Sequence, residues 1–112
     1  MRKPKTVYEL RCRECGDGWN SIVQPLQDEV QRLGGTVRQI KEKFGGLRFY
    51  CSLPKKISEN KRHAFRRRVE QAEEASFRVC ETCGAPGELV NHKGYLFTAC
   101  PACLERKRQL NP

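Results

Sequence analysis

Residues 80–103, CETCGAPGELVNHKGYLFTACPAC, contain two C-x-x-C pairs in the pattern C-x2-C-x16-C-x2-C. Each pair can form a knuckle, a tight turn that directs two thiolates at one metal ion, and Gly84 follows the first pair, where such a turn needs an unhindered backbone. Four thiolates complete a tetrahedral shell without an open position, so the metal would be structural. The pattern predicts one zinc ion with the ligands Cys80, Cys83, Cys100 and Cys103. Iron is the main alternative, since a four-thiolate site does not exclude it.

The residues between the two cysteine pairs predict a short hairpin. Two runs suited to strands, residues 88–90 and 95–97, flank the turn-forming stretch 91–94. A hairpin between two knuckles is the form of a zinc ribbon, which we expect over residues 79–104. We expect the ribbon to form one compact unit with an α+β core at residues 1–78, and residues 105–112 to be a frayed basic tail.

A longer hairpin is predicted at residues 36–53, TVRQIKEKFGGLRFYCSL, where two strand-like runs flank Gly45 and Gly46. Both glycines tolerate the positive φ of a tight two-residue turn. A turn at these glycines pairs three residues before it with three after it on one mostly apolar face: Phe44 with Leu47, Glu42 with Phe49, and Ile40 with Cys51. The other face is then basic with one aromatic side chain: Lys41, Lys43, Arg48 and Tyr50.

One helix is expected before this hairpin in the sequence and one after it. The first can be capped by Asp17, has an apolar stripe that starts at Trp19, and ends at a Gly-Gly pair. Pro25 removes a helix hydrogen bond, so the regular part of the helix is expected to begin nearer residue 20. The second helix runs from a Ser58 cap to about residue 77, with Phe65 on its inner face. The predicted fold is therefore α+β: a helix, a two-stranded hairpin, a long helix and a C-terminal zinc ribbon.

The chain is strongly basic, with 22 Lys and Arg against 13 Asp and Glu and a formal net charge of +9. This balance favours polyanionic partners or acidic protein surfaces, and it excludes a protein that imitates DNA by an acidic surface. Residues 55–68 alone contain seven Lys or Arg against the single acid Glu59. The same residues would also suit a helix that simply faces solvent.

Nucleic-acid binding is expected at two groups of basic residues, the hairpin face and the first half of the long helix. On the hairpin face Tyr50 could stack a base between cations, although an ordinary half-buried strand tyrosine would have the same pattern. The candidate nucleic-acid-binding residues are Lys41, Lys43, Arg48, Tyr50, Lys55, Lys56, Lys61, Arg62, Arg66, Arg67 and Arg68.

Three further cysteines leave a second metal site open. Cys12 and Cys15 form a third C-x-x-C pair, and Cys51 and His63 could complete a site of three thiolates and one imidazole with them. In the other interpretation, Cys51 is a small buried apolar residue and the N-terminal pair is reduced and near the surface. The odd number of cysteines, six of them in C-x-x-C pairs, favours metal binding in a reducing compartment over a disulfide framework.

No catalytic residues are expected. The only histidines are His63 on the basic helix and His92 at a hairpin tip, and no phosphate-binding glycine loop, nucleophile elbow or zinc-hydrolase motif occurs. There is also no apolar run of signal-peptide or membrane-spanning length, so we expect a cytoplasmic protein. One zinc ion, or two if the second site exists, is the expected cofactor.

Four segments together carry a resemblance to a known group of proteins: CGDGW at residues 15–19, IKEKFGGLRFY at residues 40–50, QAEEAS at residues 71–76, and CETCGAPGELV at residues 80–90 with its later C-x-x-C. The chain resembles small phage and prophage proteins that share a KEKFGGLRFY-like hairpin and a four-cysteine, zinc-ribbon-like tail. The resemblance extends from about residue 16 to residue 103. It implies a mobile genetic element that acts in a bacterial host cytoplasm, and it implies no particular reaction.

Together these features predict a zinc-stabilised phage accessory protein that binds nucleic acid or a host nucleoprotein complex without catalysis. The alternative is a protein-directed inhibitor of bacterial defence or transcription machinery, of the anti-CRISPR kind, that docks on an acidic or apolar protein surface. A nuclease with a site hidden from sequence inspection is a third hypothesis. Neither a membrane nor a small-molecule substrate is an expected partner.

Overall fold

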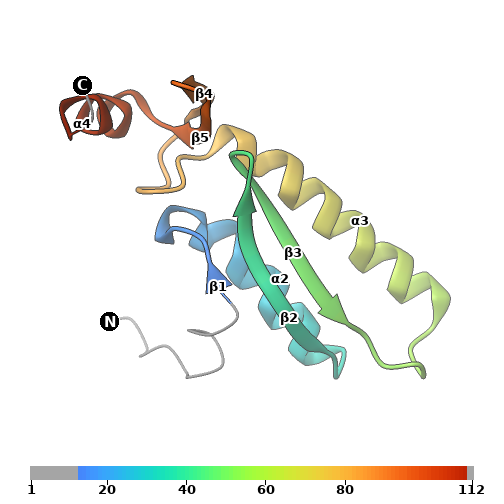
Figure 1. Ribbon diagram of the computed structural model, residues 1–112. Helices are drawn as coiled ribbons and strands as arrows, with labels where there is room; N and C mark the ends of the chain where they lie inside the picture. The colour runs from blue at the N-terminus through green and yellow to red at the C-terminus, as the bar shows by residue number, and fades with distance from the viewer. Residues whose placement is uncertain (1–12, 111–112) are drawn as a thin grey trace, which may run out of the picture.

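A computed structural model describes residues 13–110, and Figure 1 shows the order and arrangement of the elements. The first half contains β1 (Arg13–Glu14), the 3-10 helix η1 (Asp17–Trp19), α2 (Asn20–Arg32), β2 (Thr36–Lys43) and β3 (Gly46–Ser52). The second half contains α3 (Glu59–Ala75), η2 (Ser76–Arg78), β4 (Glu88–His92), β5 (Tyr95–Ala99) and α4 (Pro101–Leu110). Over this described range the fold is α+β, as expected, with three α-helices and two small sheets. None of the three helices is long and apolar enough to cross a membrane.

The larger sheet has three strands in the order β1-β2-β3, so the expected two-stranded hairpin gains a third strand. β1 runs parallel to β2, with Arg13 opposite Ile40, and β3 runs antiparallel to β2. Side chains of α2 and α3 pack together with one face of this sheet. Their shared core consists of Trp19, Val23, Leu26, Val30, Val37, Ile40, Leu47, Phe49 and Phe65. The described helices leave the other face open, and Arg48 and Tyr50 on it are exposed.

Helix α2 follows directly after one 3-10 turn, and its start at Asn20 confirms the expected late beginning. Pro25 lies inside the helix at an exposed position, so water can bond the carbonyl that loses its helical donor. Trp19 at the helix start is fully buried. The helix ends where Gly34 adopts a φ of 78° and the N–H of Gly35 donates to the Val30 carbonyl at 2.8 Å.

The turn between β2 and β3 lies one residue earlier than the sequence suggested. Phe44 and Gly45 are its two central residues, with φ of 54° and 88°, which is the type I′ arrangement. Ile40 therefore opposes Phe49 and Glu42 opposes Leu47, so the predicted pairing was wrong by two positions. Because side chains alternate along a strand with a period of two, this shift leaves the strand residues on their expected faces, but Phe44, expected on the apolar face, lies in the turn and is exposed.

A β-bulge in β2 shapes the buried face of the sheet. Val37 pairs with Cys51 and Gln39 pairs with Tyr50, so Arg38 has no pairing partner of its own on β3. The extra residue lets Val37 and Ile40 both point into the core although they are three positions apart. The Arg38 side chain is exposed, and its Nε donates to the Ser52 hydroxyl at 2.8 Å.

β3 is an edge strand, and residues of α3 and η2 bond two of the N–H groups on its free edge. The N–H of Leu47 donates to the hydroxyl of Ser76 at 2.8 Å. The N–H of Phe49 donates to a carboxylate oxygen of Glu73 at 2.9 Å. At the other end of α3 the predicted cap is confirmed, because the Ser58 hydroxyl accepts from the Lys61 N–H. These bonds hold α3 alongside β3 (Figure 1).

The C-terminal region confirms the predicted short hairpin of β4 and β5. Its turn residues Lys93 and Gly94 have φ of 54° and 86°, again the type I′ arrangement. Phe97 and Ala99 of β5 form a second buried cluster with three of the cysteines. Helix α4 continues to Leu110, so the frayed tail predicted for residues 105–112 was wrong up to that residue. Residues 105–110 contain no glycine or proline and extend the helix that begins with Pro101.

Candidate metal centre and basic face

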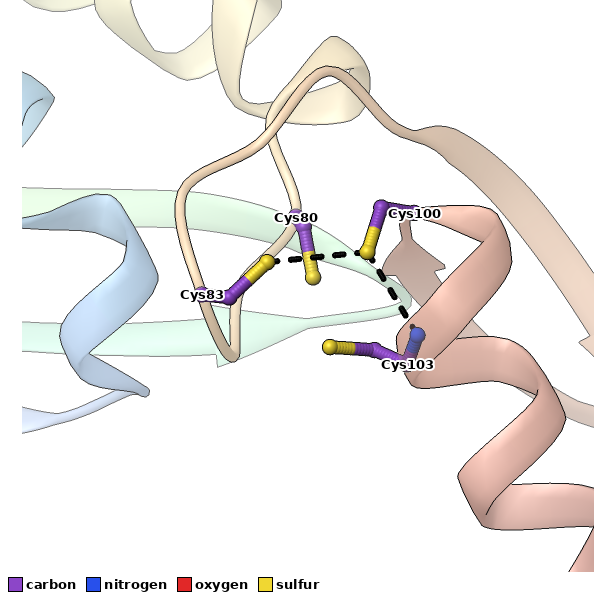
Figure 2. Close-up of side chains that lie close together, drawn as sticks. All are labelled: Cys80, Cys83, Cys100 and Cys103. Atoms are coloured by element: carbon purple, nitrogen blue, oxygen red, sulfur yellow. Dashed lines mark hydrogen bonds between the residues drawn. The ribbon is translucent and has the colours of Figure 1, made fainter.

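The first knuckle is a tight turn between η2 and β4 that contains Cys80 and Cys83. The N–H of Cys80 donates to the Ala85 carbonyl at 2.8 Å, and the N–H of Gly84 donates to the Cys80 carbonyl at 2.9 Å. Gly84 has a φ of 84°, in the left-handed region that favours glycine, as the sequence predicted. The turn therefore brings both thiols to the same side of the chain (Figure 2).

The second knuckle joins β5 to α4. Cys100 directly follows β5, and Cys103 lies in the first turn of α4. The N–H of Cys103 donates to the sulfur of Cys100 at 3.4 Å, and the N–H of Leu104 donates to the Cys100 carbonyl at 2.9 Å. An N–H directed at a sulfur stabilises its thiolate form, which is the form that binds metal.

The four sulfur atoms converge on one point from the two knuckles (Figure 2), and all lie within 4.8 Å of one another. The sulfurs of Cys83 and Cys100 are 3.5 Å apart. Tetrahedral ligands at about 2.3 Å from a central ion would lie about 3.8 Å from each other, so the arrangement fits such a shell. Cys80, Cys100 and Cys103 are buried and Cys83 is exposed. The four thiolates can therefore bind one metal ion.

The thiols of this cluster differ in acidity. Burial raises the pKa of Cys80, but hydrogen bonds with the backbone of Cys100, Cys83 and Thr82 outweigh it and bring the pKa down to about 6. A hydrogen bond with the Cys100 side chain, followed by burial, raises the pKa of Cys103 to about 12. Four thiolates this close repel one another, so a divalent cation is what would hold all four deprotonated. The donor set thus fits a metal ion better than it fits four free thiols.

The loop at residues 16–19 holds the first knuckle in place. Glu81, between the two cysteines, accepts the Gly16 N–H on its carboxylate at 2.9 Å and the Gly18 N–H on its backbone carbonyl at 2.7 Å. A Cβ on Gly18 would lie 2.2 Å from the carbonyl oxygen of Cys80, closer than any real contact. The two glycines of the GDGW segment therefore let the backbone approach the metal centre directly.

The tip of the β2–β3 hairpin contacts the metal centre's hairpin. The hydroxyl of Thr98 donates to the Gly45 carbonyl at 2.7 Å, and a Cβ on Gly45 would lie 2.4 Å from a methyl group of Leu89. A Cβ on Gly46 would lie 2.2 Å from the ring of Phe77. Gly46 does not have a positive φ, so close packing, and not the expected turn geometry, requires glycine there.

The metal centre is thus held by two loops of the α+β core. Comparison of the chain with protein-family models, curated proteins and solved structures finds no match. The chemistry of the site itself then indicates its role. A shell closed by four sulfurs has no free position for substrate, so a metal bound there would stabilise the fold.

The basic hairpin residues form what we call the open face: Lys41, Lys43, Arg48 and Tyr50. Lys41 pairs opposite Arg48, and their neighbours Ile40 and Phe49 point into the core, so these side chains point the other way. The ammonium group of Lys41 lies 5.7 Å from the centre of the Tyr50 ring. The structure therefore brings these predicted residues together on one uncovered surface.

The second basic group lies on α3 and on the loop before it. Its exposed members are Lys55, Lys56, Lys61, Arg66, Arg67 and Arg68. Arg62 is half-buried, and its Nη2 donates to the Pro54 carbonyl at 2.9 Å. Arg68 lies 3.5 Å from a carboxylate oxygen of Glu29, which neutralises part of its charge. Because α3 covers the buried side of the sheet, this group and the open face lie on different sides of the sheet, separated by the edge of β3.

The predicted second metal site is not assembled. Cys12 lies outside the described residues. Of the other three, Cys15 follows β1 and Cys51 lies on β3, two strands that β2 separates, while His63 is exposed on α3. Within residues 13–110 the four-cysteine cluster is the only group of three or more His, Cys, Asp or Glu close enough to share a metal. Cys51 packs against the core, and burial raises its thiol pKa, in agreement with the apolar interpretation.

Sequence reasoning missed the residues that position the metal centre. No local pattern marks Glu81, because a carboxylate between the two cysteines of a C-x-x-C pair is not needed as a ligand. Gly16 and Gly18 likewise have no neighbour in the sequence that indicates their contact with Glu81. The signal that could have identified them is the unusual Gly-x-Gly spacing before a buried tryptophan, which indicates a close approach of two backbones.

Proposed function

We propose that this protein is a zinc-stabilised nucleic-acid-binding protein that contacts its ligand through the open face of the sheet. The observation that carries the proposal is the environment of Tyr50, a residue that is 44% exposed on the face of the sheet that none of the described helices covers. Lys41 lies beside the Tyr50 ring, and Arg48 pairs opposite Lys41. Proteins that bind single strands combine such aromatic platforms, on which bases stack, with cations that contact the phosphates.

Zinc is the metal we propose for the four-cysteine site, with the two knuckles and the β4–β5 hairpin forming a zinc ribbon. Four thiolates at tetrahedral spacing are the usual ligands of structural zinc. The site lies between α4 and the core, and Glu81 within it bonds the core loop at Gly16. Zinc would therefore fix the position of the C-terminal hairpin relative to the core.

The basic group on α3 supports the same function through long-range attraction. Its cations contribute to a net charge of +9 and are mostly exposed. A surface of this sign raises the local concentration of a polyanion and speeds its association, and salt screens the effect. The open face would then make the close contacts, and α3 would add contacts to neighbouring phosphates.

Oligonucleotide binding measured by fluorescence anisotropy tests this proposal. Contacts to about six phosphates would lower the affinity on the order of a thousandfold between 50 and 200 mM salt. Reversal of two charges on the open face, Lys41→Glu with Arg48→Glu, should abolish binding. The matched control reverses two exposed charges on α4, Arg106→Glu with Arg108→Glu, and should retain most of the affinity. Equal losses in both double variants, or no binding by the wild type at low salt, would overturn the proposal.

A protein-directed inhibitor is the second candidate, and one observation favours it. Phe44 at the hairpin tip is 66% exposed, and the neighbouring Leu89 of β4 is also exposed. Exposed apolar side chains at a rigid junction suit a protein partner. This candidate predicts that a host protein co-purifies after nuclease treatment and is lost with Phe44→Ser but retained with Lys41→Glu and Arg48→Glu. Co-purification that nuclease abolishes would contradict it.

A further inference from the structure

A cavity of about 240 Å³ lies between the free edge of β3 and α3. Its apolar walls include Phe49, Phe65 and Val69. The rings of Phe49 and Phe65 meet edge to face, with their centres 6.5 Å apart. Its polar lining includes Arg62 and Arg66 from α3. Pockets for drug-sized ligands are larger, roughly 300 to 1,000 Å³. The cavity therefore suits one small ring system with an anionic substituent.

The backbone of β3 presents a hydrogen-bonding edge to this cavity. The N–H groups of Leu47 and Phe49 point to the free edge and are occupied by Ser76 and Glu73. Strand alternation directs the N–H and carbonyl of Cys51, two residues further along, to the same edge. No hydrogen bond joins the Cys51 N–H to a side chain in the part of the chain that the structure describes. Cys51 also lines the cavity, so a donor and an acceptor lie side by side at its wall.

The two arginines give the mouth of the cavity its charge. Arg62 is held in place by its bond to the Pro54 carbonyl, and its Nε lies 3.8 Å from Glu59. Arg66 lies one helical turn further along α3, so both side chains reach the same opening. No carboxylate is among the residues that line the cavity. Guanidinium groups donate several hydrogen bonds in a plane, which suits a phosphate.

Tyr50 connects this cavity to the open face, because it belongs to the open face and also lines the cavity. We infer that the cavity binds one unpaired nucleobase of a strand that lies on the open face, with the phosphate of that nucleotide at Arg62 and Arg66. The inference rests on the proposed function and specifies its ligand as single-stranded nucleic acid. A planar base fits between apolar walls, and its polar edge can bond the N–H and carbonyl of Cys51.

Nuclear magnetic resonance of the zinc-loaded full chain tests the inference with a minimal probe, uridine 5′-monophosphate. The methyl signals of Val69 and the amide signal of Cys51 should shift as the nucleotide is added to millimolar concentration. Ribose 5-phosphate has the same phosphate without a base and should leave the Val69 methyl signals in place. If none of the four ribonucleoside monophosphates shifts the Val69 and Cys51 signals, or if ribose 5-phosphate shifts them equally, the inference is wrong.

Two arginine variants provide a matched control. Arg66→Gln removes a charge from the mouth of the cavity, and Arg106→Gln removes the same charge from an exposed position on α4, which does not line it. Arg66→Gln should weaken nucleotide binding on the order of tenfold, and Arg106→Gln should leave it nearly unchanged. Equal effects would overturn the inference. Binding of oligonucleotides on the open face without any change at Val69 and Cys51 would overturn it while leaving the proposed function intact.

The same titration separates other ligand classes. N-acetyl-leucine carries a carboxylate on an apolar group and represents the end of a peptide. Shifts at Val69 and Cys51 with this compound, and none with the nucleotides, would overturn the inference in favour of a peptide site. If neither single-stranded nor duplex oligonucleotides bind the wild type at low salt while the nucleotides still shift the Val69 and Cys51 signals, the proposed function fails and the cavity remains a nucleotide site.

Discussion

The indole Nε1 of Trp19 donates a hydrogen bond of 2.8 Å to the backbone carbonyl of Val79, the residue before the first metal-binding cysteine. Trp19 is fully buried in the core that α2 shares with the sheet. One side chain therefore belongs to the larger core and also fixes the position where the first knuckle begins. Stability of the core and retention of the metal should be linked through this bond.

The variant Trp19→Phe tests that link. It removes the hydrogen bond and part of the buried volume, and should lower the free energy of unfolding by about 2 to 4 kcal/mol. It should also speed the transfer of the bound metal ion to a colorimetric chelator. Val30→Ala, at the far end of α2, is the control, since it weakens the same core without contact to the knuckle. Similar rates of metal release from the two variants would contradict the link.

Removal of one ligand should remove the metal. Cys83→Ser should lose the single bound ion in native mass spectrometry and unfold the C-terminal hairpin, because the binding energy of a structural site is folding energy. Cys51→Ala is the control, and it should keep the ion because Cys51 lies outside the cluster. A metal-free wild type with unchanged structure would contradict the metal centre. Two ions in the wild type would indicate a further site that involves Cys12.

Alanine substitutions at two turn glycines should distinguish the cost of backbone strain from the cost of a steric clash. Gly45 and Gly94 have nearly equal φ, 88° and 86°, but a Cβ on Gly45 would meet Leu89 whereas a Cβ on Gly94 would meet nothing within 4 Å. Gly94→Ala should lower the free energy of unfolding by about 1 kcal/mol, and Gly45→Ala by about 2 to 4 kcal/mol. Thermal unfolding of both variants measures the difference. Equal losses would show that the hairpin tip does not pack on β4.

The thiol of Cys51 should make stability depend on alkaline pH. Burial raises its pKa from the ordinary value of 9.0, so the folded state keeps the proton at pH values where the unfolded state has lost it. Stability from this group is therefore present below pH 9 and is lost as the pH rises through the raised pKa. Compared with Cys51→Ala, the wild type should lose stability faster between pH 8 and 10. Parallel curves in urea unfolding would contradict the prediction.

Loss of the Tyr50 ring should affect the binding of single strands more than the binding of duplexes. Tyr50→Ala should weaken binding of a single-stranded oligonucleotide by about 1 to 3 kcal/mol and leave duplex binding nearly unchanged, because only unpaired bases can stack on the ring. Tyr95→Ala removes another exposed tyrosine, one on β5 and not part of the open face, and should have no effect. Anisotropy titrations with both ligands measure this. An equal loss for single strands and duplexes would contradict base stacking.

The elements that depend on short spacing were predictable from the sequence. The two C-terminal C-x-x-C pairs, the Ser58 cap and the apolar period of α2 each involve a few neighbouring residues, and the structure has them where they were expected. The faces of the main hairpin were also predictable, since alternation survives a shift of two residues.

The contacts that position the metal centre were not predictable, because they join distant residues. Gly16 and Glu81 are 65 positions apart, and no local pattern indicates that they meet. The register of the main hairpin was missed for a related reason. Two adjacent glycines favour a turn in which they are the two central residues. The ring of Phe77 instead packs against Gly46, and Phe44 and Gly45 are the residues with positive φ.

The two hydrogen bonds from Ser76 and Glu73 to β3 also affect how the protein behaves at high concentration. A strand edge with a full row of unpaired donors and acceptors can recruit a strand from another molecule, and such recruitment is a route to aggregation. Here the N–H groups of Leu47 and Phe49 are already bonded, so two donors of this edge are not available to another strand. The exposed sheet is in this way protected against adding strands from other copies of the protein along this edge.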